Sequence, residues 1–209
     1  MKTVKLNNVS KKYKDKVVLD NVNISFKTGN SYMLVGYNGA GKTTLLKIII
    51  GLITPTKGEV EKKEIKIGYV PEKYILPEYI KVKDYLMVLG KLRKIPYSKL
   101  CSIIDNNLKE WGLYEYRDYK VKQLSKGMIQ KVVLIQCFFH EPDLYIFDEA
   151  LNGLDIRMQE KLLKKIGDLK KQKKIVIITS HYPKLYEEYI DIIYLIENAK
   201  VRKIDKEEC

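Results

Sequence analysis

Several short stretches of the chain alternate hydrophobic and polar residues, which is the pattern of a half-buried β-strand. The alternating stretches are residues 4–9, 22–26 and 65–70. Asn8 interrupts the first of them. Other stretches are apolar almost throughout and predict fully buried strands. These are residues 31–35, 144–149 and 174–179. A closing β segment is expected within residues 191–204.

Apolar residues recur at helical spacing between these strands. Residues 45–50 predict one helix, and residues 82–113 predict two helical segments separated by Pro96. Ser125 is a residue type that caps helices, and it predicts a helix running to about His140. A further helix is expected over residues 161–170. The helical region after residue 82 therefore forms a small insertion between strands of the main sheet.

The charge of the chain is strongly positive. Lysine and arginine number 39 against 26 acidic residues, which gives a formal charge of +13. Such a charge suggests nucleic acid or an anionic membrane surface as a partner. Seven lysines and one acid lie between residues 161 and 174, but leucine and isoleucine recur among them at helical spacing. This is typical of a core-facing helix with a solvated lysine face, so we do not expect direct nucleic-acid binding.

Length and cysteine content narrow the class of protein. A chain of 209 residues lies within the usual range of one domain. Its cysteines, Cys101, Cys137 and Cys209, are odd in number and widely spaced, so we expect reduced thiols rather than a disulfide framework or a metal site. The apolar runs are far shorter than the ~18 residues of a membrane span. We expect a protein that is neither secreted nor itself inserted in a membrane.

Residues 36–44 read Gly-Tyr-Asn-Gly-Ala-Gly-Lys-Thr-Thr and match the phosphate-binding pattern G-x-x-x-x-G-K-[ST]. A predicted strand precedes the motif and a predicted helix follows it, as the pattern requires. The glycines let backbone N–H groups turn inward around phosphate oxygens at a helix N-terminus. Lys42 offers a charge to the outer phosphates, and Thr43 offers a hydroxyl to Mg²⁺. The motif predicts a site for a nucleoside triphosphate.

Asp148 and Glu149 end one of the buried stretches. In a parallel α/β sheet, the carboxyl end of a strand is where the ligand binds. Asp148 suits the Mg²⁺ shell, and Glu149 suits the role of orienting or deprotonating an attacking water. Acidic pairs can also simply mark the end of a strand, but the phosphate loop upstream favours the functional interpretation.

Three other residues each allow two interpretations. Tyr13, in the basic loop of residues 11–14, could stack on a nucleobase or be an ordinary exposed aromatic. The helix start at Ser125 could be a second anion-binding surface or an ordinary cap. His181 follows a predicted strand that ends at the same edge of the sheet. It could contact the outer phosphate or the water, or be a structural histidine.

Taken in order, these motifs make the chain resemble the ATPase subunit of ATP-binding cassette transporters over essentially its whole length. Tyr13 matches the family's adenine-stacking aromatic, Glu149 its catalytic carboxylate and His181 its switch histidine. The Walker A loop corresponds to Gly36, Tyr37, Asn38, Gly39, Ala40, Gly41, Lys42, Thr43 and Thr44. The signature motif, residues 124–128, includes Ser125, Lys126, Gly127 and Met128. The Walker B strand spans residues 145–148, and the loop that crosses the dimer interface is Asn152, Gly153, Leu154 and Asp155.

The resemblance implies an α/β fold: a P-loop NTPase with a mixed central sheet, an antiparallel β subdomain and a small helical subdomain. It implies a single ATPase domain, in which residues 1–72 and 141–209 form the nucleotide-binding core with the β subdomain. Residues 73–140 would form the helical subdomain that carries the signature motif. The implied cofactors are ATP and Mg²⁺, with Thr43, Glu72 and Asp148 at the metal.

The resemblance also implies partners. Two ATPase subunits, identical or different, would enclose each ATP between the Walker loops of one and residues 125–128 of the other. A separate transmembrane permease would hold them at the inner face of the cell membrane. The signature has Lys126 and Met128 where glycine and glutamine are usual, which resembles bacterial exporters of peptides, drugs or lipids. Glu72 stands where glutamine is usual, and Tyr37 where proline is frequent. The alternative function is a soluble cassette ATPase that acts on nucleic acid or the ribosome.

Overall fold

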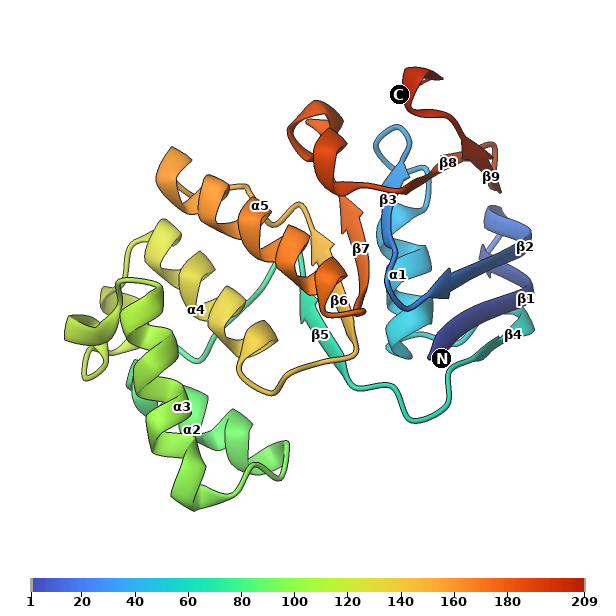
Figure 1. Cartoon of the computed structure of the whole chain (residues 1–209). Coiled ribbons are helices and arrows are strands. Elements are labelled where there is room, and N and C mark those ends of the chain that lie inside the picture. Colours follow the sequence, from blue (N-terminus) through green and yellow to red (C-terminus); the bar gives the residue numbers. More distant parts are fainter. Residues whose placement is uncertain (1, 209) are drawn as a thin grey trace.

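The computed structural model describes residues 2–208, so Cys209 lies outside the described residues. The chain begins with an antiparallel hairpin of β1 (Thr3–Tyr13) and β2 (Lys16–Lys27). The short strand β4 (Lys57–Glu61) pairs antiparallel with the other edge of β1. These strands form a small sheet at one end of the molecule (Figure 1).

A second, six-stranded sheet runs through the centre of the molecule in the order β5-β6-β7-β3-β8-β9. Neighbouring strands are parallel except for β9, which pairs antiparallel with β8. The strands are β3 (Ser31–Val35), β5 (Ile67–Val70), β6 (Leu144–Asp148), β7 (Ile175–Thr179), β8 (Ile192–Glu197) and β9 (Lys200–Ile204). The mixed sheet, the antiparallel sheet and the helices confirm the predicted fold class.

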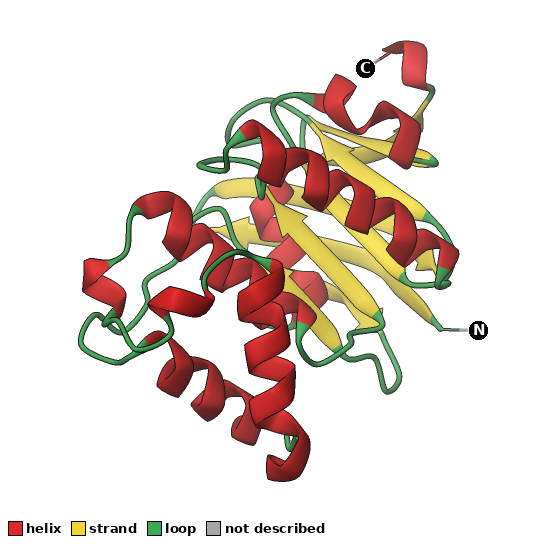
Figure 2. Ribbon diagram, turned by 60° about the vertical axis from the view of Figure 1, so that its left-hand side comes forward, coloured by secondary structure: helices red, strands yellow, loops and turns green. Residues whose placement is uncertain are grey.

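Helices lie on both faces of the central sheet. In Figure 1, α1 lies between this sheet and the smaller one, while α2, α3 and α4 form the opposite end of the molecule. Figure 2 shows α5 crossing the sheet strands on one face. The α-helices are α1 (Lys42–Ile50), α2 (Val82–Leu92), α3 (Tyr97–Glu110), α4 (Lys126–Phe138) and α5 (Ile156–Lys171). Short 3₁₀ turns occupy Tyr114–Tyr116, Val121–Gln123, Pro183–Tyr189 and Lys206–Glu208.

The side-chain alternation of the central strands divides the interior into two hydrophobic clusters. Leu34 and Ile146 face the cluster that contains α1 and the small sheet. Met33 and Phe147, the neighbours of those residues in the sequence, face the cluster of the other helices. Because both faces are buried, the central strands need apolar residues at nearly every position, as the sequence has. This explains why the continuous apolar stretches predicted strands correctly.

Three boundaries differ from the sequence predictions. The basic stretch at Tyr13 is not a loop, because β1 extends through it to a two-residue turn. Strand β4 begins at Lys57, in a segment where the alternation of hydrophobic and polar residues predicted no strand. Helix α5 begins at Ile156, five residues earlier than its apolar spacing suggested, because Asp155 accepts a hydrogen bond from Met158 N at 2.9 Å and caps it.

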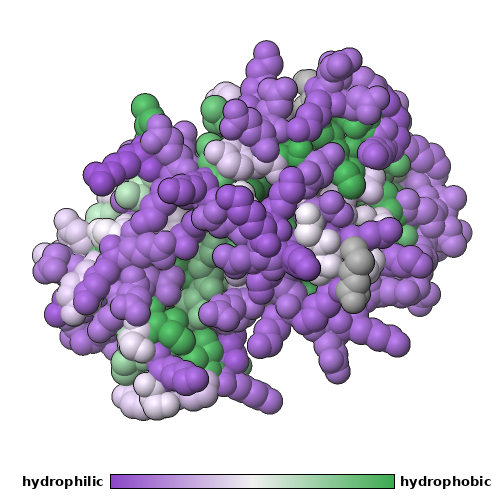
Figure 3. Space-filling view, viewed as in Figure 1, coloured by the Kyte–Doolittle hydropathy of each residue, from purple (hydrophilic) through white to green (hydrophobic). Residues whose placement is uncertain are grey.

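The surface agrees with the charge of the sequence. Hydrophilic side chains cover most of the face in Figure 3, including the region over α5. Lys164 and Lys171 of α5 are exposed, which agrees with the solvated lysine face predicted for this helix. No helix among the described residues is long and apolar enough to cross a membrane. Cys101 is an exposed free thiol and Cys137 a buried one, as expected.

Candidate nucleotide-binding site

The phosphate loop connects the end of β3 to the start of α1. Gly36 has a φ of 151° and Gly41 a φ of 114°, in the region that favours glycine. A Cβ atom at Gly36 would lie 2.5 Å from the carbonyl oxygen of Ile196, so only glycine fits there. The loop backbone therefore turns directly into the N-terminus of α1, where unpaired N–H groups favour an anion.

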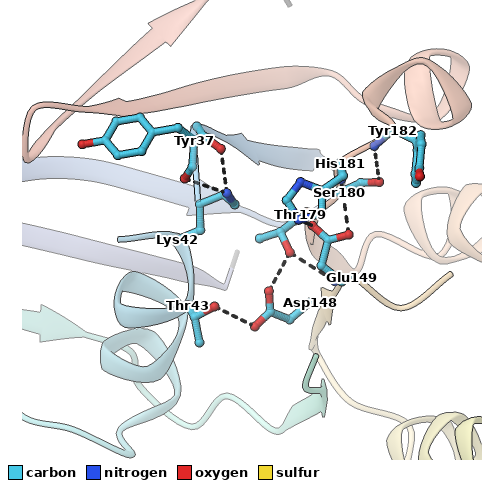
Figure 4. A network of polar contacts seen from close by, with 10 residues as sticks. Tyr37, Lys42, Thr43, Asp148, Glu149, Thr179, Ser180, His181 and Tyr182 are labelled. Atoms are coloured by element: carbon cyan, nitrogen blue, oxygen red, sulfur yellow. Dashed lines mark hydrogen bonds and ion pairs between the residues drawn. The ribbon is translucent and has the colours of Figure 1, made fainter. Parts of the chain in front are cut away.

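Lys42 is the first residue of α1, and its side chain turns back over the loop. Its Nζ donates to the carbonyl oxygens of Gly36 at 2.6 Å and of Tyr37 at 3.2 Å. Figure 4 shows the ring of Tyr37 pointing away from this contact. The ammonium group is thus held above the concave side of the loop, where outer phosphates would lie.

Asp148 ends β6 and is almost fully buried. Its carboxylate accepts hydrogen bonds from hydroxyl groups on three different elements. Thr179 Oγ1 donates to Oδ1 at 2.6 Å, and Thr43 Oγ1 donates to Oδ2 at 3.2 Å (Figure 4). The hydroxyl of Tyr69, on β5, lies 3.3 Å from the same Oδ2. Charge-assisted hydrogen bonds of this kind compensate the burial of a carboxylate.

Glu149 follows β6 with a φ of 54°, which turns its side chain out of the strand direction. Its carboxylate is buried, and Oε2 accepts a hydrogen bond from the backbone N–H of His181 at 3.2 Å. The imidazole Nε2 of His181 lies 3.6 Å from Oε1. Burial raises the pKa of Glu149, while His181 opposes that shift. A buried carboxylate with a raised pKa is suited to accept a proton.

These groups line one cavity of about 400 Å³. The cavity is lined by Val18, Asn38, Gly39, Gly41, Lys42, Thr43, Thr44, Glu72, Asp148, Glu149 and His181. Residues from the phosphate loop, the acidic pair, the segment after β5 and the segment after β7 therefore meet, although Thr43 and Asp148, for example, are 105 residues apart in the sequence. The sequence identified all of these residues except Val18, which lies on the hairpin and belongs to none of the motifs.

Other predicted residues lie outside this cavity. Tyr13 is exposed at the end of β1, with Lys11 Nζ 5.1 Å from the centre of its ring, and it is not among the residues that line the cavity. Ser125 caps α4 by accepting a hydrogen bond from Met128 N at 3.3 Å. A Cβ atom at Gly127 would lie 2.9 Å from the carbonyl oxygen of Gly153. The signature motif and the loop at residues 152–155 thus pack together, apart from the cavity of their own chain.

Sequence reasoning missed three polar residues that support the site. Thr179 donates to Asp148 and accepts a hydrogen bond from Glu149 N. Tyr69 also contacts Asp148. The buried Gln130 of α4 donates to the carbonyl oxygen of Ala150 at 3.0 Å. This bond links α4, the helix that begins with the signature motif, to the segment after Glu149. Each lies inside a predicted strand or helix, where nothing in the local sequence separates it from a packing residue.

The comparison with protein families decides the identity of this arrangement. Residues 19–152 match the family described as ABC transporter. The chain belongs to that family. This match spans the phosphate loop, the signature motif and the acidic pair, and the chain is an ABC ATPase.

Relatives of this ABC ATPase are found in archaea and bacteria. It is 36% identical over 197 residues to the uncharacterized ABC transporter ATP-binding protein MJ1023 of Methanocaldococcus jannaschii, covering 94% of this chain and 75% of that protein. It is 37% identical to the zinc import ATP-binding protein ZnuC of Rickettsia conorii, covering 85% and 76%. It is 29% identical to the Nod factor export ATP-binding protein I of Burkholderia orbicola, covering 92% and 67%.

Solved structures of the family share this fold. One is described as the dimeric structure of a post-hydrolysis state of the ATP-binding cassette MJ0796 bound to ADP and Pi. It superposes with a TM-score of 0.87 at 26% identity, covering 97% of this chain and 98% of that one. The fold of this ABC ATPase is therefore one that binds nucleotide in a related protein.

Proposed function

We propose that this ABC ATPase hydrolyses Mg²⁺-bound ATP between two ATPase subunits and so powers transport through a separate membrane subunit. One observation carries the proposal. A single cavity holds a phosphate loop with its lysine, a buried aspartate beside a threonine hydroxyl, and a buried glutamate next to a histidine. These are the groups that phosphoryl transfer to water requires.

The donor set fits magnesium. Thr43 Oγ1 and Asp148 Oδ2 lie 3.2 Å apart, and Glu72 lines the same cavity. All three offer oxygen atoms, which Mg²⁺ prefers. No cluster of three or more histidine, cysteine, aspartate or glutamate residues suited to a metal occurs within residues 2–208. This agrees with an ion that takes its remaining ligands from phosphates and water. When bound, it neutralises charge that develops on the phosphates.

The residues of the chain then have separate roles. The loop N–H groups and Lys42 hold the phosphates, and Asp148 is fixed by its hydroxyl donors. Glu149 accepts the proton of the attacking water, because its carboxylate is buried and its pKa is raised. His181 is anchored at Glu149 by its backbone N–H, and it would contact the water or the outer phosphate.

The second half of the site comes from another subunit in this proposal. Residues 125–128 form the N-terminus of α4 and lie apart from the cavity of their own chain. A helix N-terminus with its exposed serine is suited to a phosphate. Tyr13, exposed at the tip of the hairpin, would stack on the adenine. The two copies, identical or different, are expected to close when ATP lies between them.

The segment that follows Glu72 supports docking to a membrane subunit at the inner face of the cell membrane. Ile75 is 99% exposed and Tyr79 is 70% exposed. Ile75 borders a groove of about 510 Å³ formed with Val121, Lys122 and Ile129. Tyr79 lies beside it, with Lys122 Nζ 4.5 Å from the centre of its ring. Large exposed apolar residues beside a groove mark interaction sites. Residues 73–140 would act as the subdomain that transmits changes in the contacts of Glu72 at the nucleotide site to this partner.

We propose that the transporter exports a peptide, drug or lipid. This proposal rests on the resemblance of residues 124–128 to exporter signatures. Relatives named for zinc import and for Nod factor export both resemble the chain, so the direction depends on the membrane subunit. A soluble ATPase acting on nucleic acid or the ribosome is the alternative that the charge of +13 favours.

The test co-expresses the chain with any multi-span membrane protein that the neighbouring reading frame encodes. We expect the wild-type chain to remain on washed membranes only when that protein is co-expressed. Ile75→Glu should stay in the soluble fraction while its ATPase rate remains within about twofold. Leu52→Glu is the matched control: Leu52 lies away from the groove and is 65% exposed, and the variant should remain on membranes.

Retention of Ile75→Glu on membranes would overturn the docking surface. Failure of the wild type to bind membranes, together with salt-dependent binding to duplex DNA, would support the alternative.

A further inference from the structure

Tyr69 is a strand residue whose hydroxyl reaches the candidate metal site. It lies on β5 and pairs with Ile146 of the neighbouring β6, two residues before Asp148. Side chains two residues apart on a strand share one face, so Tyr69 and Asp148 lie on the same face of the sheet. The hydroxyl of Tyr69 lies 3.3 Å from Asp148 Oδ2. The function proposed above counts this hydroxyl among the donors to Asp148 but gives it no role of its own.

The two carboxylate oxygens of Asp148 are not held equally. Oδ1 accepts from Thr179 at 2.6 Å, and both groups are buried. Oδ2 is shared by Thr43 at 3.2 Å and Tyr69 at 3.3 Å. Thr43 is the residue whose hydroxyl oxygen is suited to the metal. When that oxygen turns to the metal, Tyr69 is the remaining hydroxyl that the structure places on Oδ2.

We propose that Tyr69 is a positioning residue that fixes the rotation of the Asp148 carboxylate and so sets its affinity for the metal of the metal–nucleotide complex. The inference rests on the proposed function, because it assumes that Asp148 meets a magnesium ion. A carboxylate anchored at Oδ1 alone can still rotate about its last side-chain bond. A second donor at Oδ2 removes that freedom before the ion binds, which is how outer groups orient metal ligands.

The ring and the hydroxyl of Tyr69 can be separated by mutation. The partly buried ring packs against the hydrophobic cluster of α1 and the small sheet. Phenylalanine would keep this packing and lose only the donor. A tyrosine hydroxyl is protonated at neutral pH and is therefore able to donate. The contact between Tyr69 and Asp148 also connects β5 to the proposed metal site. Glu72 and Ile75 follow β5 in the sequence.

The test compares Tyr69→Phe with Tyr194→Phe in the full chain. Tyr194 lies on β8 and packs against the same hydrophobic cluster. Within residues 2–208, its hydroxyl donates only to a backbone carbonyl oxygen, that of Ser25, at 3.5 Å. The probe is Mn²⁺ titrated into protein saturated with a non-hydrolysable ATP analogue and followed by electron paramagnetic resonance. Calorimetry with ATP in a chelator gives the metal-free affinity, and thermal unfolding checks the fold.

We expect Tyr69→Phe to weaken Mn²⁺ binding about tenfold, the effect of one lost hydrogen bond to a charged group. The Mg²⁺ concentration for half-maximal ATPase activity should rise by a similar factor, with kcat at saturating Mg²⁺ largely kept. The metal-free ATP affinity should stay within about twofold, and Tyr194→Phe should match the wild type throughout.

Equal Mn²⁺ affinity of Tyr69→Phe and the wild type would overturn the inference. So would a loss of metal-free ATP binding, because the hydroxyl would then support the phosphate loop rather than the metal ligand. If the wild type itself bound no Mn²⁺ with the nucleotide, the proposed function would fail instead, and the two failures are thus distinguishable.

Discussion

Lys42 shows how a single side chain is prepared for a phosphate. Its ammonium group is held by two carbonyl oxygens of the loop that it closes. Three N–H donors and a compact charge allow it to exchange such partners for phosphate oxygens without a change in the backbone. The residue is therefore positioned before nucleotide arrives, which limits the conformational entropy lost on binding.

Lys42→Ala should weaken ATP binding about tenfold to a hundredfold, because it removes charge-assisted hydrogen bonds worth ~1.5–3 kcal/mol. Isothermal titration calorimetry measures this directly. Lys203→Ala, which removes an exposed lysine of β9, controls for the loss of one positive charge and should bind as the wild type does. Unchanged affinity in Lys42→Ala would contradict the assigned site.

Glu149→Gln should keep nucleotide affinity and lower the ATPase rate at least about a hundredfold, the contribution expected of a general base. Glutamine retains an oxygen that can accept the hydrogen bond from the His181 N–H, but it cannot take the proton of water. Phosphate release in a single-turnover assay separates the chemical step from binding. Turnover equal to the wild type would show that another group is the base.

Residues with a motif were predictable from the sequence, and residues without one were not. The sequence identified Lys42 from the phosphate-loop motif. It identified Asp148, Glu149 and His181 because they end or follow strands at the same edge of the sheet as that loop. The structure brings all four residues to one cavity. Tyr69 and Thr179 were missed because an aromatic or a threonine in a strand usually only packs. Their roles depend on which strands become neighbours, and the order β5-β6-β7 cannot be read from a single strand.

Helix α4 begins with the signature motif and is followed, after its last residue, by a partly buried polar contact at His140. There His140 Nδ1 accepts from Arg93 Nη1 at 2.9 Å, and Nε2 donates to the carbonyl oxygen of Ile67 at 3.2 Å. A neutral imidazole can make both bonds, whereas a protonated one would face Arg93 with a second donor. Three elements, α2, α4 and β5, therefore meet at a histidine that the fold keeps neutral.

The pH dependence of stability follows from this contact. Burial, and then Arg93, lower the pKa of His140 to about 4, while an unfolded histidine has a pKa near 6.5. The unfolded chain therefore binds more protons between these values, so stability is complete above pH ~6.5 and falls as the pH drops toward ~4.

Urea unfolding of the wild type and His140→Gln tests this pH dependence. Between pH 7 and pH 5 the wild type should lose about 1 kcal/mol more than the variant, after allowance for solvent screening of a group that is only partly buried. Parallel pH profiles of the two proteins would show that His140 titrates normally in the folded state.

Among the elements, the sequence predicted best those that are buried on both sides. β6 and β7 have only buried residues, so their hydrophobicity identified them. β4 was missed because it is a polar, mostly exposed edge strand that owes its existence to pairing with β1. The start of α5 was misplaced for a related reason: its first residues are exposed, and only the cap at Asp155 marks them.

At the scale of the whole molecule, the chain separates the two halves of the proposed site. The cavity with Lys42 and Glu149 lies on one part, and the N-terminus of α4 with Lys126 lies apart from it. From the residues alone, the phosphate loop predicted an anion site, whereas the helix start at Ser125 allowed either an anion site or an ordinary cap. The proposal that the halves belong to different subunits came from the resemblance to the family, because complementarity between two copies leaves no periodic pattern in a sequence.

Lys126→Glu tests this separation in a Glu149→Gln background, where ATP persists. Lys126 is exposed at the start of α4 and does not line the cavity of its own chain. The substitution should leave the ATP affinity of a single subunit unchanged. It should reduce ATP-dependent dimerisation at least about tenfold, because it would place a carboxylate against the triphosphate held by the partner copy. Light scattering during size-exclusion chromatography in Mg²⁺-ATP measures the dimer.

Lys164→Glu, at an exposed position on α5, makes the same change of charge away from the proposed interface and should dimerise as the background does. If both variants weakened the dimer equally, net charge rather than the helix terminus would govern association. If Lys126→Glu instead weakened ATP binding by the monomer, the signature motif would act on the nucleotide of its own chain, and the shared site would be wrong. Loss of the dimer with unchanged monomer affinity requires that residues 125–128 meet the nucleotide of another subunit.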